Sequence, residues 1–398
     1  MSGLTTIEDA LGSILAHVEV LPEESVPLAV AHGRVLARPA RAAVDLPPFP
    51  SSAMDGFAVR AGDTPGTLPV AFRISAGRVA PEPLSPGTAA AIATGGAVPE
   101  GADSVVPVEL AREVDGRVEV PEPVEPGAHV RGRGGDVEEG AVVVDRGVRL
   151  GAAQIGALAA AGIPGVLCAR RPRIAVLATG SELRPPGTRL EPGQIYESNR
   201  SLIAAALSSA GAEVDLLPVV ADDEAAHREA IGHGLASADV LVTSGGVSVG
   251  PHDLVRGVED ELGVEEVFWG VAVKPGKPVS FGVRGSTLVF GLPGNPVSSL
   301  VGSLLFVRPA VLALQGASEP GPAYQFARLA QPLRRNPNRD EFVRSRRRLE
   351  DAGIALEPIS GQDSHMIVRA ASADALVHVP RGTGEIAAGE TVRYLALE

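Results

Sequence analysis

Residues 170–316 alternate short apolar segments with helical segments, and this alternation constrains the fold more than any other feature. Strands that alternate with helices build a mostly parallel sheet covered by helices on both faces. The sequence therefore predicts a central three-layer α/β/α domain over 170–318. The expected strands are "RIAVLA", "EVDLLPVV", "DVLVTS", "VFWGVAV" and "TLVFG", and the expected helices cover 198–210, 222–236, 252–262 and 297–314.

The segments on either side have a different character. Residues 46–136 contain short β-prone runs between proline- and glycine-rich turns, which predicts a β-rich lobe. Residues 1–45 and 137–169 include helical stretches and are expected to form a discontinuous helical and linker domain. After the linker "GASEPGPA", residues 325–398 return to short strands and predict a small β-barrel. The expected fold class is thus a multidomain protein of α/β and β parts.

Charge and composition exclude several classes of protein. The net charge of -13 argues against general affinity for nucleic acid or for an anionic membrane. The single cysteine, Cys168, excludes an intramolecular disulfide and a cysteine-based zinc cage. The longest apolar stretch, 297–314, is interrupted by Arg308 and Pro309, so we expect a buried helix rather than a membrane span. The N-terminus has no basic segment of a secretory signal, so the expected location is the cytoplasm.

Lysine occurs at only two positions, Lys274 and Lys277, although the chain holds 35 lysine and arginine residues together. Both lie in "VAVKPGKPVSF". An ammonium group is a compact charge with rotatable donors, which suits oxyanions approached from varied directions. The flanking prolines and glycine are expected to fix the backbone so that both ammonium groups reach one edge of the sheet. The alternative is a pair of solvated surface lysines.

Small-residue or glycine-rich loops follow four of the predicted strands. Ligands bind beyond the carboxyl ends of parallel strands, and the amides of such loops can cradle phosphate. Each loop alone could be an ordinary turn, but four at one edge favour an anion site. No loop matches the P-loop or dinucleotide fingerprints. The candidate substrate-binding residues are Thr179, Gly180, Ser181, Ser244, Gly245, Gly246, Ser248, Gly250, Pro275, Gly276, Pro293, Gly294 and Asn295.

Acidic residues lie next to two of these loops. Glu182 follows the first loop and Asp253 follows the second. Carboxylates near a phosphate site typically bring in Mg²⁺, which takes oxygen ligands from protein and substrate together. Both residues stand where helices are expected to start, so simple capping is the alternative. Asp55 in "SSAMDGF" and Asp136 in "RGGD" occupy turns that could be purely structural.

Two further candidates lie near the C-terminus. Arg339 belongs to the run "NPNRDEFVRSRRR", and Ser364 belongs to "GQDSHMI". An arginine run is usually a solvated surface, and capture of an anion is the alternative.

The motifs "SSAMDGFAV", "RGGD", "LATGSEL", "TSGGVSVGPHD", "VKPGKP" and "GLPGNPVSS" together resemble those of the molybdopterin molybdenumtransferase family. This family includes the bacterial molybdenum-insertion enzymes and the C-terminal domain of gephyrin. The motifs follow the family order and the termini fit, so the resemblance covers nearly the whole chain. It implies insertion of molybdate into adenylylated molybdopterin, with hydrolysis of the pterin–AMP phosphoanhydride and release of AMP and molybdenum cofactor.

The resemblance also implies a set of site residues. Asp55, Asp136, Glu182 and Asp253 are implied as ligands of a divalent metal, which would be Mg²⁺ or alternatively Zn²⁺ or another divalent ion. Catalytic roles are implied for Asp55, Glu182 and Asp253 together with Lys274 and Lys277. Arg339 and Ser364 match the family's C-terminal ligand contacts.

The partners that the resemblance implies are of two kinds. The first is a second copy of the chain, in an elongated homodimer whose active cleft lies between the central domain of one subunit and the β-rich lobe of the other. The second is transient contact with the adenylyltransferase and with molybdoenzymes. No nucleic-acid or membrane partner is expected.

Other functions on the same fold remain as alternatives. A molybdopterin adenylyltransferase shares the central domain, but that activity is usually carried without long flanking segments such as those of this chain. A non-catalytic scaffold or a pterin-binding storage module would bind ligand without releasing AMP. A scaffold that had lost catalysis could lose its carboxylates, yet Asp55, Glu182 and Asp253 are all present.

Overall fold

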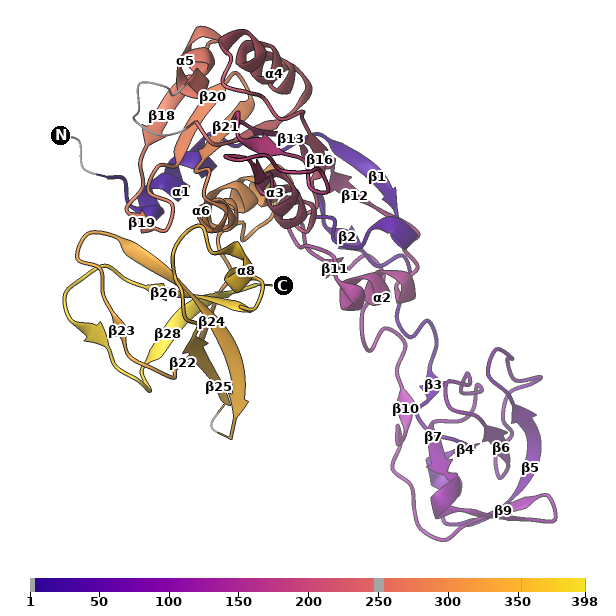
Figure 1. The fold of residues 1–398 in the computed structure, drawn as a ribbon. Coiled ribbons are helices and arrows are strands. Elements are labelled where there is room, and N and C mark those ends of the chain that lie inside the picture. Colours follow the sequence, from indigo (N-terminus) through magenta and orange to yellow (C-terminus); the bar gives the residue numbers. More distant parts are fainter. Residues whose placement is uncertain (1–3, 247–253, 352, 398) are drawn as a thin grey trace.

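The computed structural model describes residues 4–246, 254–351 and 353–397. Figure 1 shows an elongated molecule, in which the central α/β domain and the C-terminal barrel lie together while the β-rich lobe extends far from both. The three-layer centre, the β-rich lobe and the C-terminal barrel predicted from the sequence are all confirmed.

The central sheet has the strand order β16-β13-β17-β21-β20-β18. Its first four strands are parallel, and β20 runs antiparallel to both of its neighbours. Helices α1, α3, α6 and α7 pack on one face, and helices α4 and α5 pack on the other. The strands are β13 (Arg173–Ala178), β16 (Glu213–Leu216), β17 (Val240–Ser244), β18 (Glu265–Trp269), β20 (Ser280–Arg284) and β21 (Thr287–Leu292). The helices are α1 (Ile7–Ala16), α3 (Asn199–Ser208), α4 (Glu224–Ser237), α5 (Leu254–Glu261), α6 (Pro296–Gly302) and α7 (Arg308–Leu314).

Helices α6 and α7 form one long apolar helix around a π-helical segment, Ser303–Val307. Pro309 has no N–H to donate, so the regular ladder is interrupted just before it. By length and apolarity this helix could cross a membrane, but 72% of its most apolar window is buried inside the protein. It is therefore the buried core helix that the sequence predicts.

The first helix belongs to the central core. Thr6 caps α1, because its Oγ1 atom accepts a hydrogen bond from the Asp9 amide at 3.0 Å. The apolar face of α1, formed by Ile7, Ala10 and Ile14, packs into the same cluster as the central sheet. The rest of the helical and linker region has its own small core. Its elements are β1 (Glu23–Pro27), the 3-10 helix η1 (Leu28–Val30), β2 (Ala40–Arg41), β11 (Val142–Val144), α2 (Ala152–Ala160) and β12 (Gly165–Ala169).

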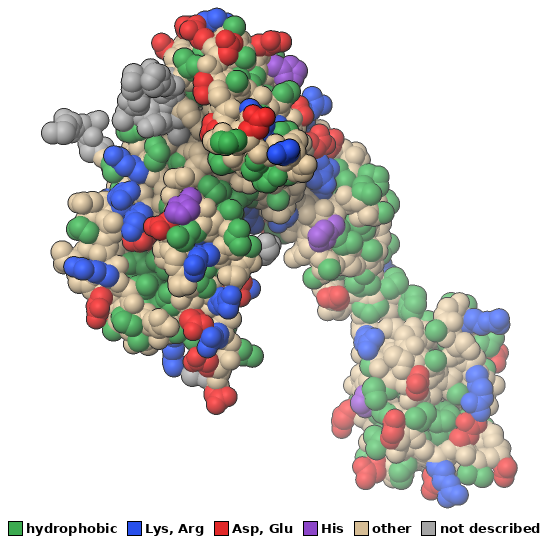
Figure 2. Space-filling model, viewed as in Figure 1, with side chains coloured by type: hydrophobic (Ala, Val, Ile, Leu, Met, Phe, Trp, Pro, Cys, Tyr) green, Lys and Arg blue, Asp and Glu red, His purple; other side chains and the backbone are tan. Residues whose placement is uncertain are grey.

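The β-rich lobe has one twisted sheet with the order β7-β4-β6-β5-β9-β8. It is joined to the rest of the molecule by a narrow neck, which Figure 2 shows as a waist in the space-filling surface. The short strand pair β3 with β10 lies at this neck. The elements are β3 (Ser51–Ser52), β4 (Gly56–Val59), η2 (Ala61–Asp63), β5 (Gly66–Ile74), β6 (Ala89–Ile92), β7 (Ser104–Pro107), η3 (Val108–Leu110), β8 (Arg112–Val114), β9 (Arg117–Val120) and β10 (Val130–Arg131).

The C-terminal barrel closes because β24 pairs with both β25 and β26. Its sheet gains an extra edge strand from the central domain, β19 (Val273–Lys274), which runs parallel to β24. The sequence predicts one strand across "VFWGVAV", but β18 ends at Trp269 and the chain turns at Gly270, which has a φ of +87°. The barrel elements are β22 (Tyr324–Leu329), β23 (Leu333–Arg334), β24 (Asp340–Glu350), β25 (Gly353–Pro358), α8 (Ile367–Ala370), β26 (Ala375–Val379), β27 (Glu385–Ile386) and β28 (Thr391–Ala396).

Candidate active site

Loops after β13, β17 and β21 meet at the carboxyl edge of the central sheet. The Thr179 amide donates to the Ser244 carbonyl at 3.1 Å, and the Gly245 amide donates to the Leu292 carbonyl at 3.1 Å. Gly245 has a φ of +95°, and a Cβ atom there would lie 2.8 Å from the Thr179 carbonyl oxygen. Glycine is required at this position because a side chain would force the first two loops apart.

A cleft of about 610 Å³ opens at this edge. It is lined by several of the predicted residues and by residues that the sequence did not single out. The predicted ones are Thr179, Glu182, Ser244, Gly246, Pro293, Gly294 and Asn295. The others include Tyr196, Glu197, Ser198, Asn199, His365 and Ile367, together with Leu183 and Ile195 of the short parallel pair β14 (Leu183–Arg184) and β15 (Ile195–Tyr196).

Asn199, which begins α3, ties two of these loops together. Its Nδ2 atom donates to the Ser244 Oγ atom at 2.8 Å and to the Gly294 carbonyl at 2.7 Å. The side chain is buried, and its Oδ1 atom has no hydrogen-bond partner among the described residues. The tripeptide "ESN" at the start of a predicted helix is the sequence signal for this residue.

The first loop is held in a fixed shape. Ser181 and Asp222 bond reciprocally, because the Asp222 amide donates to the Ser181 Oγ atom at 3.0 Å and the Ser181 amide donates to the Asp222 Oδ2 atom at 3.3 Å. The exposed carboxylate of Glu182 folds back over the main chain, and a Cβ atom at Gly180 would lie 2.6 Å from its Oε2 atom. The glycine before Ser181 therefore makes room for the Glu182 carboxylate at the cleft.

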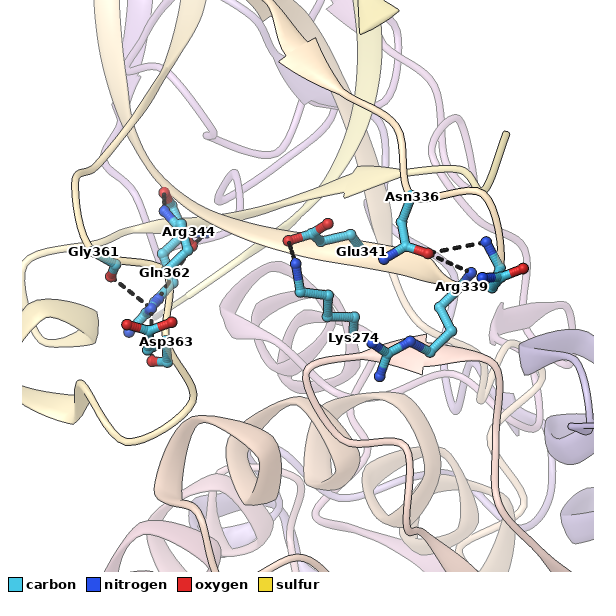
Figure 3. Close-up of polar contacts among 9 residues, drawn as sticks. Lys274, Asn336, Arg339, Glu341, Arg344, Gly361, Gln362 and Asp363 are labelled. Atoms are coloured by element: carbon cyan, nitrogen blue, oxygen red, sulfur yellow. Dashed lines mark hydrogen bonds and ion pairs between the residues drawn. The ribbon is translucent and has the colours of Figure 1, made fainter. Parts of the chain in front are cut away.

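The two lysines have different environments. The Nζ atom of Lys274 lies 2.9 Å from the Glu341 Oε1 atom of β24, as Figure 3 shows. Lys277 is exposed and has no ion pair in the part of the chain that the structure describes. The cleft is lined by Pro278 of the same loop rather than by either lysine. Between the lysines, Pro275 is half-buried and Gly276 packs beside Ser298 of α6.

The C-terminal barrel contributes the two other predicted contacts. Ser364 lies against the start of α6, because its Oγ atom accepts from the Asn295 Nδ2 atom at 2.9 Å and its carbonyl accepts from the Val297 amide at 3.0 Å. Arg339 is half-buried, and its amide donates to the Asn336 Oδ1 atom at 3.1 Å. In Figure 3 its side chain extends toward the Lys274 loop.

Buried Arg344 fixes the loop that carries Ser364. Its guanidinium group donates to the Met366 carbonyl at 2.7 Å, the Gly361 carbonyl at 2.7 Å and the Asp363 carbonyl at 3.0 Å. Desolvation lowers the pKa of Arg344, although it stays far above neutrality because guanidinium does not deprotonate in proteins. Arg344 therefore positions the loop that carries Ser364, although its own side chain is buried.

Asp55 and Asp136 lie elsewhere in the molecule. The Asp55 Oδ1 atom accepts from the Thr94 amide at 2.6 Å and from the Thr94 Oγ1 atom at 2.9 Å, and these bonds lower the pKa of Asp55. Asp136 is exposed near the neck, where its amide donates to the Leu46 carbonyl at 2.9 Å. Figure 1 places the turn between β3 and β4, which carries Asp55, far from the ends of β13 and β17.

One chain therefore does not bring the predicted metal ligands together. Within residues 4–246, 254–351 and 353–397 there is no group of three or more histidine, cysteine or acidic residues that could hold a metal ion. The predicted residues Ser248, Gly250 and Asp253 lie outside the described residues.

Three family profiles match successive parts of the chain. They are the MoeA N-terminal region (domain I and II) over residues 5–162, the probable molybdopterin binding domain over 175–313, and the MoeA C-terminal region (domain IV) over 327–397.

Curated relatives and solved structures match over nearly the whole length. Molybdopterin molybdenumtransferase 2 of Mycobacterium tuberculosis is 39% identical, covering 92% of this chain and 93% of its own. Molybdopterin molybdenumtransferase of Haemophilus influenzae is 34% identical, covering 98% of both chains. A crystal structure of a molybdopterin biosynthesis moeA protein from Pyrococcus horikoshii superposes with a TM-score of 0.79 at 33% identity, covering 99% of both chains.

Proposed function

Because the chain belongs to the molybdopterin molybdenumtransferase family, and is thus a transferase of molybdenum cofactor biosynthesis, we propose that it inserts molybdate into adenylylated molybdopterin. In the proposed reaction the pterin–AMP phosphoanhydride is hydrolysed, and AMP and molybdenum cofactor are released. The observation that carries this proposal is the cleft at the sheet edge, which glycine-rich main chain and hydroxyl side chains line and which Pro278 of the lysine loop borders.

The size and lining of the cleft support a pterin nucleotide as the ligand. Its volume of about 610 Å³ is typical of sites for small molecules. Hydroxyl groups of Thr179 and Ser244 and the glycine-rich main chain at 245–246 offer polar contacts for a phosphate. We assign the pterin phosphate to this part of the cleft.

The cations near the cleft support binding of a second oxyanion. Lys277 is exposed, and Arg339 extends toward the same loop. Molybdate and the phosphoanhydride are both oxyanions, and fixed cations stabilise the negative charge that develops during their reaction. We assign molybdate to the rim of the cleft at Pro278, next to the loop that carries Lys274 and Lys277.

The residues of a single chain meet only part of what a divalent metal ion needs. Asp55 is ionised and one of its oxygens is already used by Thr94, while Glu182 offers an exposed carboxylate at the cleft. Carboxylate oxygens are the ligands that Mg²⁺ prefers, but a single chain keeps these two residues far apart. No step of the proposed reaction is therefore routed through a metal ion.

We further propose that the site is completed in a homodimer, with the β-rich lobe of one subunit over the cleft of the other. The separation of Asp55 from the cleft within one chain supports this arrangement. Mixing the inactive variants Asp55→Asn and Lys274→Ala tests it, because a mixed dimer has one site with both residues intact. Random reassociation should restore about a quarter of the wild-type rate, whereas a site within one chain would give no recovery.

The direct test is release of AMP from adenylylated molybdopterin with Mg²⁺, measured with and without molybdate. We expect release that molybdate stimulates, and loss of it in Lys274→Ala and Glu182→Ala. Glu191→Ala is a matched control, because Glu191 is an exposed carboxylate of the segment between β14 and β15 that does not line the cleft. Tight pterin binding with no AMP release would contradict the proposal and indicate a binding or scaffold protein.

A further inference from the structure

Glu341 is a carboxylate that faces the candidate oxyanion site from the C-terminal barrel. Its Oε1 atom lies 2.9 Å from the Lys274 Nζ atom, and the two residues are direct neighbours in the β19–β24 register. Figure 3 shows the Lys274 side chain reaching along β24 toward Glu341. One of only two ammonium groups in the chain is thus partly neutralised at the place where an anion is expected to bind.

This ion pair is shielded on its carboxylate side, as is the pair between Arg133 and Asp45. The Glu341 side chain is 16% exposed and the Lys274 side chain is 44% exposed, so the carboxylate is shielded while the ammonium still reaches solvent. By contrast, Arg228 pairs with Glu224 on α4 with both side chains about half exposed. Backbone pairing of β19 with β24 places Lys274 and Glu341 side by side on neighbouring strands.

The ammonium of Lys274 retains donors for a ligand. An ammonium group has three N–H donors, and Glu341 is its one ion-pair partner among the described residues. The local cations are Lys274, Lys277 and Arg339, so Glu341 reduces their combined charge by one. A carboxylate placed this close to the site repels an incoming anion at the same time as it orients the lysine.

We propose that Glu341 is an affinity-setting residue, whose charge limits how tightly the Lys274 side of the cleft holds an oxyanion and so permits release. The proposal rests on the assignment of an oxyanion to this side of the cleft. Over a separation of a few ångströms at a protein surface, removal of one negative charge strengthens anion binding about tenfold. The gain shrinks with added salt because the interaction is partly screened.

Calorimetric titration of the full-length protein with molybdate alone tests this inference. We expect Glu341→Gln to bind molybdate about tenfold more tightly than the wild type at low salt, with a smaller gain at high salt. Glu341→Asp keeps the charge and should stay close to the wild type. Glu357→Gln is the matched control, because Glu357 is a half-buried barrel carboxylate paired with Arg348 instead of a lysine at the site.

Two results would overturn the inference. Weaker or unchanged molybdate binding by Glu341→Gln would mean that the carboxylate only orients Lys274. Equal tightening by Glu341→Asp and Glu341→Gln would mean that side-chain geometry matters and charge does not. Thermal unfolding of each variant shows whether it is folded, and only folded variants are compared.

Lys277→Ala separates failure of this inference from failure of the proposed oxyanion site. If Lys277→Ala loses molybdate binding while Glu341→Gln does not tighten it, the site stands and the role of Glu341 is wrong. If the wild type and Lys277→Ala bind molybdate equally, the oxyanion assignment itself is wrong and the inference falls with it.

Discussion

The protein has two β domains, one at each side of the central α/β domain, and they differ in how closely they are joined to it. The C-terminal barrel is continuous with the centre, because β19 extends the barrel sheet and Ser364 bonds to the start of α6. The β-rich lobe joins the rest of the molecule through a narrow neck at the short strand pair β3 with β10. Both domains carry residues predicted for one site, yet only the barrel reaches that site within a single chain.

Because the two domains are joined to the centre so differently, we expect them to contribute to the site in different ways. Strand β24 presents Glu341 to the lysine loop, and Arg339 extends toward the same loop from just before the strand. Arg344 of β24 holds the Ser364 loop. The barrel therefore determines the geometry of the cleft. The lobe carries Asp55 and Asp136 on a separate body, so its contribution depends on how that body is placed. Variants in the barrel should thus alter folding and ligand binding, and variants in the lobe should alter turnover alone.

The largest expected effect is that of Asp55→Asn in the lobe. Loss of an ionised carboxylate should reduce AMP release by about a hundredfold to ten-thousandfold, while affinity for molybdate alone stays unchanged. The single tryptophan, Trp269 of β18, reports unfolding of the centre, and its transition should not move. Asp115→Asn, at an exposed turn of the same lobe, should leave the rate of AMP release unchanged. Weaker molybdate binding by Asp55→Asn would contradict the division between the two domains.

The second prediction concerns Arg344→Met in the barrel. Removing this buried guanidinium leaves the carbonyl groups of Gly361, Asp363 and Met366 without their donor. We expect a loss of about 3 kcal/mol in the free energy of unfolding, measured by urea denaturation. Arg348→Met removes an exposed arginine of the same strand and should cost less than about 1 kcal/mol. Equal losses for the two variants would show that Arg344 does not hold the barrel together.

The third prediction is a pH dependence that arises in the barrel and not in the lobe. The Nδ1 atom of buried His378 accepts from the Arg393 Nε atom at 2.5 Å, so its Nε2–H group donates to the Asp340 Oδ1 atom at 3.1 Å. Desolvation and the nearby Arg393 charge lower the pKa of His378, although Asp340 and, more weakly, Glu8 act in the opposite sense. The unfolded chain therefore binds the proton more readily than the folded chain.

The sign of this effect follows from the lowered pKa. The contribution of neutral His378 to stability is complete above the unfolded pKa of about 6.5 and is lost as the pH falls from there toward the lower pKa of the folded state. Urea denaturation of the wild type and of His378→Gln between about pH 8 and pH 5 measures it. We expect the variant to show a smaller decline in stability. If the free energy of unfolding declines equally in the wild type and in His378→Gln, groups other than His378 cause the acid sensitivity.

The smallest expected effect is that of Glu8→Gln at the contact between α1 and the barrel. The Glu8 Oε1 atom lies 3.6 Å from the Arg393 Nη2 atom, and the Glu8 side chain is 70% exposed. We expect a loss of less than about 1 kcal/mol in the free energy of unfolding, detectable as a small shift in urea midpoint that salt removes. A larger loss would show that the barrel depends on α1 as well as on β19.

Local patterns were sufficient to predict most elements of the fold. The helices α3, α4 and α2 and the central strands lie where apolar periodicity and glycine or proline boundaries indicate them. The exception is "VFWGVAV", where one apolar run supplies β18 to the central sheet and β19 to the barrel sheet. Nothing in the composition of that run distinguishes its two halves, because both are apolar.

The candidate site was predictable where it depends on the ends of strands. Glycines 245 and 294 and the residues Thr179 and Ser244 follow buried strands that lie side by side in parallel, so their convergence follows from the topology. Glu341 and Arg344 could not be predicted as parts of the site. Each belongs to an arginine-rich strand that has the appearance of a solvated surface, and only the barrel packing buries them.

The sequence by itself determined the family, the alternation of strands and helices, and the rarity of lysine that marks one loop. These properties are encoded in short segments, because periodicity, turn residues and motifs act over a few neighbouring positions. Only the tertiary structure decided that Lys274 pairs with Glu341 and that Asn199 joins two loops. It also decided that the turn between β3 and β4, which carries Asp55, lies far from the ends of the central strands. Such contacts join residues distant in the chain, and they depend on how whole domains pack against one another.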